Sequence, residues 1–247
     1  MSAVRTVWTI ARRELAGYFI SPVAYVFLVI FLLLTGFFTF TVGAFFERGE
    51  ASLASFFVWH PWLYLVLVPA VGMRVWSEER RAGTIELLLT MPVATWQAIL
   101  AKFLASWVFL AIALALTFPV VLTVNYLGSP DNGVIVAAYF GSLLLAGGFL
   151  AVGTCMSALS RSQVVAFILG VAACFVLLLA GYPLVLDAFR GWAPQTLIEA
   201  VASLSLLTHF QSITRGVLEA RDVLYFAMLI AFFLFTTTVA IDLRKAD

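Results

Sequence analysis

Six long stretches without a charged residue divide this chain. They cover residues 15–46, 51–73, 103–130, 132–160, 162–186 and 223–241. A charge at the centre of a bilayer costs roughly 2.5–3.5 kcal/mol on insertion scales, and a helix needs about 20 residues to cross. Each stretch is close to that length or longer. Trimmed at turn residues, they predict membrane-spanning helices near 22–45, 59–76, 103–126, 134–159, 164–186 and 223–241.

The composition agrees with a chain that lies mostly in lipid. Of the 247 residues, 64% are hydrophobic and only 11% are charged, whereas soluble proteins are about half apolar and about a quarter charged. One soluble core cannot bury that surplus. We therefore expect an all-α polytopic membrane protein in which residues 1–247 form a single transmembrane domain. Cys155 and Cys174 both fall inside apolar stretches, and we interpret them as small buried hydrophobes rather than disulfide or metal ligands.

The basic residues near the helix ends predict an orientation. With six spans both termini share one side, and this side holds the larger set: Arg5, Arg12, Arg13, Arg80, Arg81, Lys102, Arg161, Arg244 and Lys245. The opposite side holds Arg48, Arg190, Arg215 and Arg221. Because cytoplasmic loops carry the excess of Lys and Arg, we predict a multi-pass protein of the bacterial inner membrane with both termini cytoplasmic. The first apolar stretch is too long for a signal peptide, so we expect it to be retained.

The first 21 residues predict an amphipathic helix at the cytoplasmic membrane surface. Wound at 100° per residue, positions 3–19 separate into a basic arc and an apolar arc. The basic arc contains Arg5, Thr6, Thr9, Arg12 and Arg13, and the apolar arc contains Val4, Val7, Trp8, Ala11, Leu15 and Tyr18. We expect Trp8 to be buried and the arginines to face lipid headgroups. The chain then turns through Ser21 and Pro22 into the first span.

Glu14 lies within the apolar arc of this helix, where a lone carboxylate is costly. One interpretation gives it a basic partner, with Arg74 or Arg80 as the candidates. The alternative is that its side chain reaches water at the membrane surface.

The segment after the second predicted span indicates a short helix outside the membrane. Four consecutive charges at 78–81 end the span, and Gly83 is expected to break the helix. Thr84 is a suitable N-cap for a new helix over 85–91, which Pro92 then stops.

This short helix has features that a simple connector does not need. Glu86 lies in its first turn, where the helix dipole favours an acid. Its apolar side would hold Ile85, Leu88 and Leu89. We interpret it as a helix that docks on another protein; the alternative is a helix lying on lipid.

On the outer side, the segment 187–222 between the fifth and sixth spans is long and contains two apolar helical pieces. These pieces, 195–203 and 206–215, are too short to span, and Gly216 follows as a stop. We predict re-entrant or interfacial helices here. Asp222 is expected to cap the sixth span. His209 has no nearby ligand-type partner in the sequence, and we interpret it as an ordinary interfacial histidine.

Three runs of residues resemble one family of membrane proteins. They are EERRAGTIELLLTMP over 78–92 with Lys102 ten residues later, RELAGYFISPVAY over 13–25, and HFQSITRGVLEARDVLY over 209–225. The first resembles the first cytoplasmic loop of ABC-2 type transporter permeases. Together the three resemble the branch that contains gliding-motility-type permeases, to which permeases for nitrous-oxide-reductase maturation are related. The resemblance covers nearly the whole chain.

The resemblance implies a dimer of two six-helix subunits, with either an identical chain or a paralogue as the second copy. Two separate ATPase subunits would bind ATP and Mg, and the 85–91 helix would be the coupling helix that docks on them. The implied ATPase contacts are Glu78, Glu79, Arg80, Gly83, Thr84, Glu86 and Leu87. The N-terminal amphipathic helix would be the connecting helix, represented by Arg5, Trp8, Arg12, Arg13 and Glu14. No P-loop pattern occurs in the sequence, so we expect no enzyme activity and no cofactor in this chain itself.

Two functions remain open on this reading. In the first, the chain is the permease of an ATP-driven exporter. In the second, it transmits force to an extracytoplasmic accessory protein without moving a molecule, and 187–222 is the output surface. An ion-driven transporter is disfavoured because the six stretches hold no acidic or basic residue to serve as a relay. An intramembrane protease is disfavoured because no nucleophile is accompanied by a base. The balance of 14 basic and 13 acidic residues gives no basic field for nucleic acid.

Overall fold

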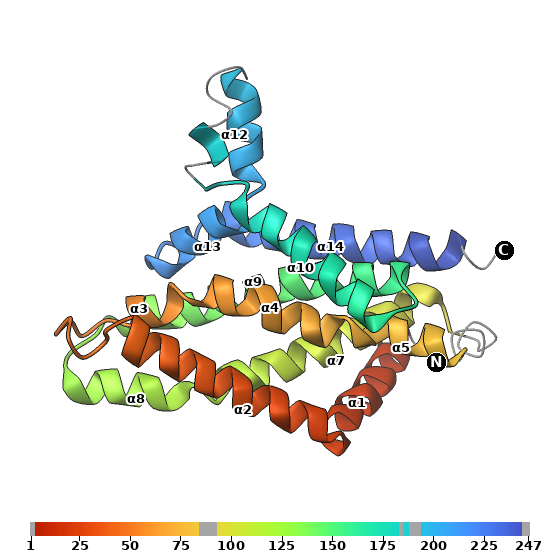
Figure 1. The fold of residues 1–247 in the computed structure, drawn as a ribbon, viewed down its shortest axis with the longest axis horizontal. Coiled ribbons are helices and arrows are strands. Elements are labelled where there is room, and N and C mark those ends of the chain that lie inside the picture. Colours follow the sequence, from red (N-terminus) through yellow and green to blue (C-terminus); the bar gives the residue numbers. More distant parts are fainter. Residues whose placement is uncertain (1–2, 84–92, 183–184, 188–193, 244–247) are drawn as a thin grey trace.

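The computed structural model describes residues 3–83, 93–182, 185–187 and 194–243, and every regular element in this part of the chain is a helix. Most of the helices lie side by side along the long axis of the molecule, as Figure 1 shows. The predicted all-α fold is therefore confirmed.

Four helical stretches are long and apolar enough to cross a membrane. They are α2 (Pro22–Phe37) with the π-helix η1 (Phe38–Val42), α7 (Thr95–Ala115) with α8 (Phe118–Leu127), α9 (Asn132–Leu159), and α14 (Ala220–Leu243). The other two predicted spans coincide with shorter helices, α4 (His60–Gly72) followed by α5 (Arg74–Ala82), and α10 (Gln163–Leu179). The chain is a polytopic membrane protein. The third span begins earlier than predicted, at Thr95, because the helix continues through Lys102 instead of starting after it.

Side-chain caps set the starts of α2 and α9. α1 (Ala3–Ile20) ends before Ser21, whose hydroxyl accepts from the Val23 N–H at 3.4 Å, and Pro22 begins α2. The predicted turn into the first span is therefore confirmed. Asp131 caps α9 in the same manner by accepting from the N–H groups of residues 133 and 134. Such caps satisfy N–H groups that have no partner within the helix.

α9 is the central helix of the bundle. It contacts α4, α5, α7, α10, α13 and α14, and its side chains at Leu145, Phe149 and Leu150 are fully buried. Small residues allow the close approach. A methyl group added at Gly153 would lie 3.4 Å from the Cα of Pro69, and one added at Gly170 would lie 3.6 Å from the Cα of Gly153. Three backbones, from α4, α9 and α10, therefore meet at this crossing.

The two cysteines lie in this core. Cys155 of α9 and Cys174 of α10 are both buried, as the sequence predicts. The Cys174 thiol is 3.8 Å from the carbonyl oxygen of Phe149, which fits a small hydrophobe with a weak donor.

The outer segment folds into the two helices that the sequence predicts, α12 (Gln195–Ser203) and α13 (Leu206–Thr214). The backbone of Gly216 then adopts a φ of 86°, which favours glycine and stops the helix. α13 packs against α9, α10 and α14 through Leu206, Phe210 and Ile213, whereas α12 stands away from the bundle in Figure 1. A further short helix on this side is α3 (Ala54–Phe57).

One end of the bundle gathers the elements that the sequence assigns to the cytoplasm. α5, the start of α1 and the end of α14 lie at this end in Figure 1, opposite α3 and the end of α8. We call it the charged end and define it by Glu14, Glu78, Glu79, Arg80 and Lys102.

Candidate functional site

Lys102 is the centre of the charged end. Its ammonium nitrogen lies 2.7 Å from Oε1 of Glu79 and 3.3 Å from Oε2 of Glu14. The lysine side chain is only 8% exposed and the two glutamates are 24% and 26% exposed. The ammonium also lies 5.6 Å from the centre of the Trp76 ring, within cation–π range. One buried cation on α7 thus joins α1 to α5.

This arrangement corrects the expectation for Glu14. Its basic partners are Lys102 and the neighbouring Arg13, at 3.3 Å each, and not Arg74 or Arg80. The sequence placed Lys102 at a membrane boundary as one more cytoplasmic charge. In the structure α7 extends past it by two turns, so that its side chain points into the contact with α1 and α5.

Ser157 of α9 holds the break between α4 and α5. Its hydroxyl donates to the carbonyl oxygen of Met73 at 2.7 Å and accepts from the N–H groups of Trp76 and Ser77 at 3.1 and 3.0 Å. A helix break exposes backbone groups that need partners when buried. Ser157 is fully buried and supplies three of these partners, so α5 is fixed to α9 at its first turn.

Arg80 fixes the other end of α5 to the same helix. Its guanidinium donates to the carbonyl oxygen of Ala158 at 2.5 Å, in the last turn of α9, where the helix dipole favours a cation. Nearby, the Thr95 hydroxyl donates to Asp242 of α14 at 2.9 Å. The charged end therefore connects α5 to α1, α7 and α9, and α7 to α14.

The predicted docking segment begins where α5 ends. Gly83 follows Ala82 with a φ of 69°, and this confirms that the glycine breaks the helix. Thr84, Glu86 and Leu87 lie outside the described residues. Of the predicted contact residues that are described, Glu79 and Arg80 face their own chain, whereas Glu78 is exposed.

α1 lies across the start of α7, with Val7 and Ala11 as its buried residues. Arg5, Arg12 and Arg13 are exposed, as the sequence predicts. Trp8 is 69% exposed within the protein alone, so it is not part of the bundle core.

Tyr18, near the end of α1, is anchored by a hydrogen bond between its hydroxyl and that of Ser106 at 2.8 Å. Burial raises the pKa of the Tyr18 phenol above its usual range. α1 is thus attached to α7 at both Lys102 and Ser106.

A second polar cluster, on the outer side, was missed by the sequence analysis. Nδ1 of His209 lies 2.6 Å from Oδ1 of Asp222, and Nε2 lies 3.0 Å from the carbonyl oxygen of Ser203. The His209 ring also stacks on Tyr225 at a centroid distance of 4.0 Å. His209 is therefore not a histidine without a partner, and Asp222 lies in the first turn of α14 instead of capping it. The helix stop at Gly216 lets the chain turn from α13 into α14. This is the sequence signal from which the His209–Asp222 contact could have been predicted.

We expect Asp222→Asn to lower the free energy of unfolding by about 1 kcal/mol, because a neutral amide accepts a weaker hydrogen bond than a carboxylate. Chemical unfolding of the purified protein in detergent measures this. Asp131→Asn is the matched control, since Asn caps a helix as well as Asp does. Equal stability of the two variants would contradict a stabilising role for the His209–Asp222 pair.

The charged end consists of contacts between helices. In the part of the chain that the structure describes, no three His, Cys, Asp or Glu residues are grouped to hold a metal ion. What the site provides instead is a set of contacts that join one short helix, α5, to three neighbours.

Comparison with known protein families gives one match. A family model described as an ABC-2 family transporter protein matches residues 62–243. This range runs from α4 to the end of α14, while α1 and α2 precede it. It includes Lys102, the outer helices α12 and α13, and the α4–α5 break that Ser157 holds. A search of curated proteins finds no match to this chain.

Proposed function

The chain belongs to the ABC-2 family of transporter membrane proteins, and from this premise we propose that it is the permease subunit of an ATP-driven exporter. The single observation that supports this best is the attachment of α5. The helix that leads into the predicted docking segment is bound to α1, α7 and α9 by Lys102, Ser157 and Arg80. A connector that only joined two spans would not need such an attachment.

The proposed topology has six crossings, with residues 1–247 as one transmembrane domain. The crossings are α2 with η1, α4 with α5, α7 with α8, α9, α10 and α14. Both termini and the charged end are proposed to be cytoplasmic, in a bacterial inner membrane. Basic residues at this end support the orientation. We propose gliding-motility-type and nitrous-oxide-reductase-maturation-type permeases as the branch that the chain resembles.

The proposed mechanism is mechanical. Two ATPase subunits, which would bind ATP and Mg, close on nucleotide binding and push the docking segments of two permease copies, identical or paralogous. In each copy α5 carries the push to α9 through Ser157 and Arg80, and to α7 and α1 through Glu79 and Lys102. Because these contacts are short and largely buried, the helices move as one body. No catalytic step is assigned to this chain.

The predicted coupling residues take two different parts in this proposal. Glu79 and Arg80 hold α5 to its own subunit, since both contact described residues of the chain. Glu78, which is exposed, and Thr84, Glu86 and Leu87, which lie outside the described residues, would meet the ATPase. Gly83 marks the boundary between the two groups.

The alternative function is transmission of force to an extracytoplasmic partner. One observation favours keeping it: α12 stands away from the bundle (Figure 1), while α13 next to it is buried against α9 and α14. A helix that projects next to a buried neighbour can serve as an output surface. Movement of α9 would reach α12 through α13 in this case.

We expect the tagged protein, purified gently from its host, to bring down an ATPase subunit with a P-loop, and Glu86→Arg to lose it. A reversed charge in the docking segment places like charges, or an unpaired charge, at the contact. Mass spectrometry of the co-purified proteins measures this, with Glu50→Arg as the control. Glu50 is an exposed acid in the loop before α3, and α3 lies at the opposite end of the bundle in Figure 1.

The results of this co-purification experiment distinguish the proposed functions. An ATPase retained by Glu86→Arg would contradict the assignment of the docking segment, and no ATPase even after mild cross-linking would contradict the permease function. An additional outer-side protein in the eluate would favour force transmission or assisted export over simple efflux.

A further inference from the structure

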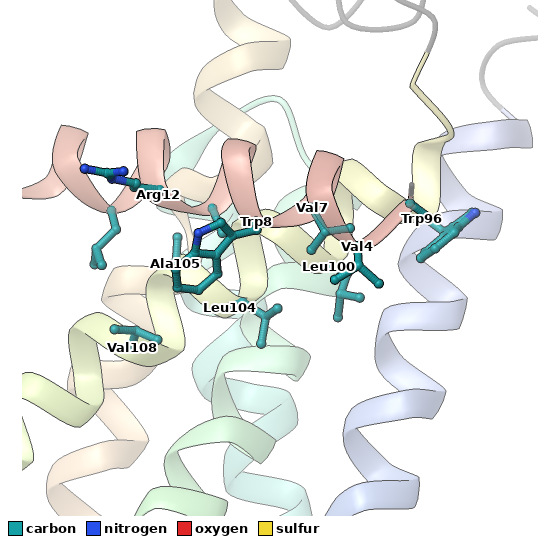
Figure 2. A pocket seen from close by; sticks show the side chains of 12 residues that line it. Val4, Val7, Trp8, Arg12, Trp96, Leu100, Leu104, Ala105 and Val108 are labelled. Atoms are coloured by element: carbon teal, nitrogen blue, oxygen red, sulfur yellow. The ribbon is translucent and has the colours of Figure 1, made fainter. Parts of the chain in front are cut away.

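An apolar groove lies on the outside of the bundle between α1 and α7 (Figure 2). Its volume is ≈ 550 Å³. Val4 and Trp8 of α1 line it on one side, and Leu100, Leu104 and Val108 of α7 line it on the other. Several of these side chains are open to the surroundings, with Val4 78%, Trp8 69% and Val108 41% exposed. Apolar surface of this kind normally marks a contact.

The direction of the groove follows α7 away from α1. Leu100 and Val108 are eight residues apart, which corresponds to about 12 Å along the helix axis. In Figure 2 Trp8 extends from α1 over Leu104, with Val108 farther along α7. With α1 at the membrane surface, the groove starts at the depth of the lipid headgroups and continues along the acyl chains.

The charged side chain of the groove lies at the end nearest the membrane surface. Of the described residues that line it, Arg12 is the one with a charge. The side chain of Arg12 makes no hydrogen bond or ion pair with any other residue in the described part of the chain. Arg5 is two turns earlier on a similar side of α1 and is also exposed. The acid of this helix, Glu14, is already paired with Lys102 and Arg13, which leaves the rim basic.

We propose that the groove binds one anionic phospholipid, with an acyl chain along Leu100, Leu104 and Val108 and the phosphate on Arg12. A guanidinium offers paired donors to phosphate oxygens, and basic pockets at the cytoplasmic side of membrane helices bind anionic headgroups. The site depends on α1 lying at the membrane surface. It does not depend on the ATP-driven mechanism, so failure to find an ATPase would leave it standing.

The headgroup contact is tested by native mass spectrometry of the detergent-purified protein titrated with dioleoyl phosphatidylglycerol or dioleoyl phosphatidylcholine. We expect the first phosphatidylglycerol to bind more tightly than the first phosphatidylcholine, and Arg12→Gln to reduce this preference about fivefold, which is the effect of one basic residue near a charged surface. Arg13→Gln is the matched control. It removes the same charge from the neighbouring position, which does not line the groove, and should keep most of the preference.

The acyl contact is tested with a residue that fills the groove. Val108→Trp is expected to weaken the first binding event for both lipids, whereas Leu122→Trp, at a 58% exposed position on α8, is expected to leave it unchanged. Gel filtration of all four variants confirms that each remains folded.

Equal losses in Arg12→Gln and Arg13→Gln would overturn the proposal, since they would show diffuse attraction to the whole basic face. Normal binding by Val108→Trp would also overturn it. So would disulfide cross-linking of two copies through Val4→Cys in phosphatidylglycerol nanodiscs, because the groove would then be covered by a second chain.

Discussion

Lys102→Met is expected to disconnect α5 from α1 and to lower the free energy of unfolding by about 2 kcal/mol. Methionine fills much of the same space, so the loss comes from the charge. Without the ammonium, Glu14 and Glu79 face each other across a largely buried position with no cation between them. Removing one partner of a fully buried pair costs about 3–5 kcal/mol. We expect less here because each glutamate stays roughly a quarter exposed and solvent screens part of the repulsion.

Chemical unfolding in detergent measures the stability, and ATP hydrolysis by the purified complex measures the coupling. A double-mutant cycle with Glu79→Gln supplies the control. The second substitution removes one of the two carboxylates that Lys102 contacts, so it should restore part of the stability lost in Lys102→Met. Additive losses in the double variant would contradict a direct Lys102–Glu79 interaction.

Gly153→Leu is expected to lower the free energy of unfolding more than Lys102→Met does, because it prevents α4, α9 and α10 from packing together. Already a methyl group at this position would touch the Cα atoms of Pro69 and Gly72, at 3.4 and 3.6 Å. A leucine adds three further carbons where the nearest atoms belong to the backbone of α4 and to the rigid ring of Pro69. Overpacking of a tight core costs about 1–3 kcal/mol and occasionally more, and we expect a loss above 3 kcal/mol here.

The amount of folded protein recovered by gel filtration after extraction measures this effect. Gly36→Leu is the matched control, because a methyl group added at Gly36 of α2 meets no atom of another part of the chain within 4 Å. If Gly153→Leu were recovered as well as Gly36→Leu, the close crossing of the three helices would not exist in the membrane.

The features that the sequence predicts correctly are local. Charge-free stretches indicate helices in lipid because the free energy of moving a residue into the bilayer depends mainly on that residue itself. Ser21 with Pro22, Gly83 and Gly216 predict helix boundaries because capping and positive φ act within a few residues. The two outer helices were likewise predicted from their own composition.

The contacts that the sequence does not predict join residues far apart in the chain. Glu14 and Lys102 are separated by 88 positions, and their meeting depends on the angle at which α1 crosses α7. The periodicity of α1 places Glu14 on the apolar side but does not say which helix covers that side. Ser157 carries no charge and is one hydroxyl among many in the sequence. Its role at the α4–α5 break follows only from the packing of α4 and α5 against α9, which brings the break next to it.

The position of α9 restricts where a cargo can travel. Six other helices surround it, and its centre is filled by Leu145, Phe149 and Leu150 without exposed surface. A molecule crossing the membrane through the middle of one subunit would have to displace this helix and with it the fold. In the proposed exporter, a cargo would therefore travel along an outer wall of the bundle, in a space closed by a second subunit or by the surrounding lipid.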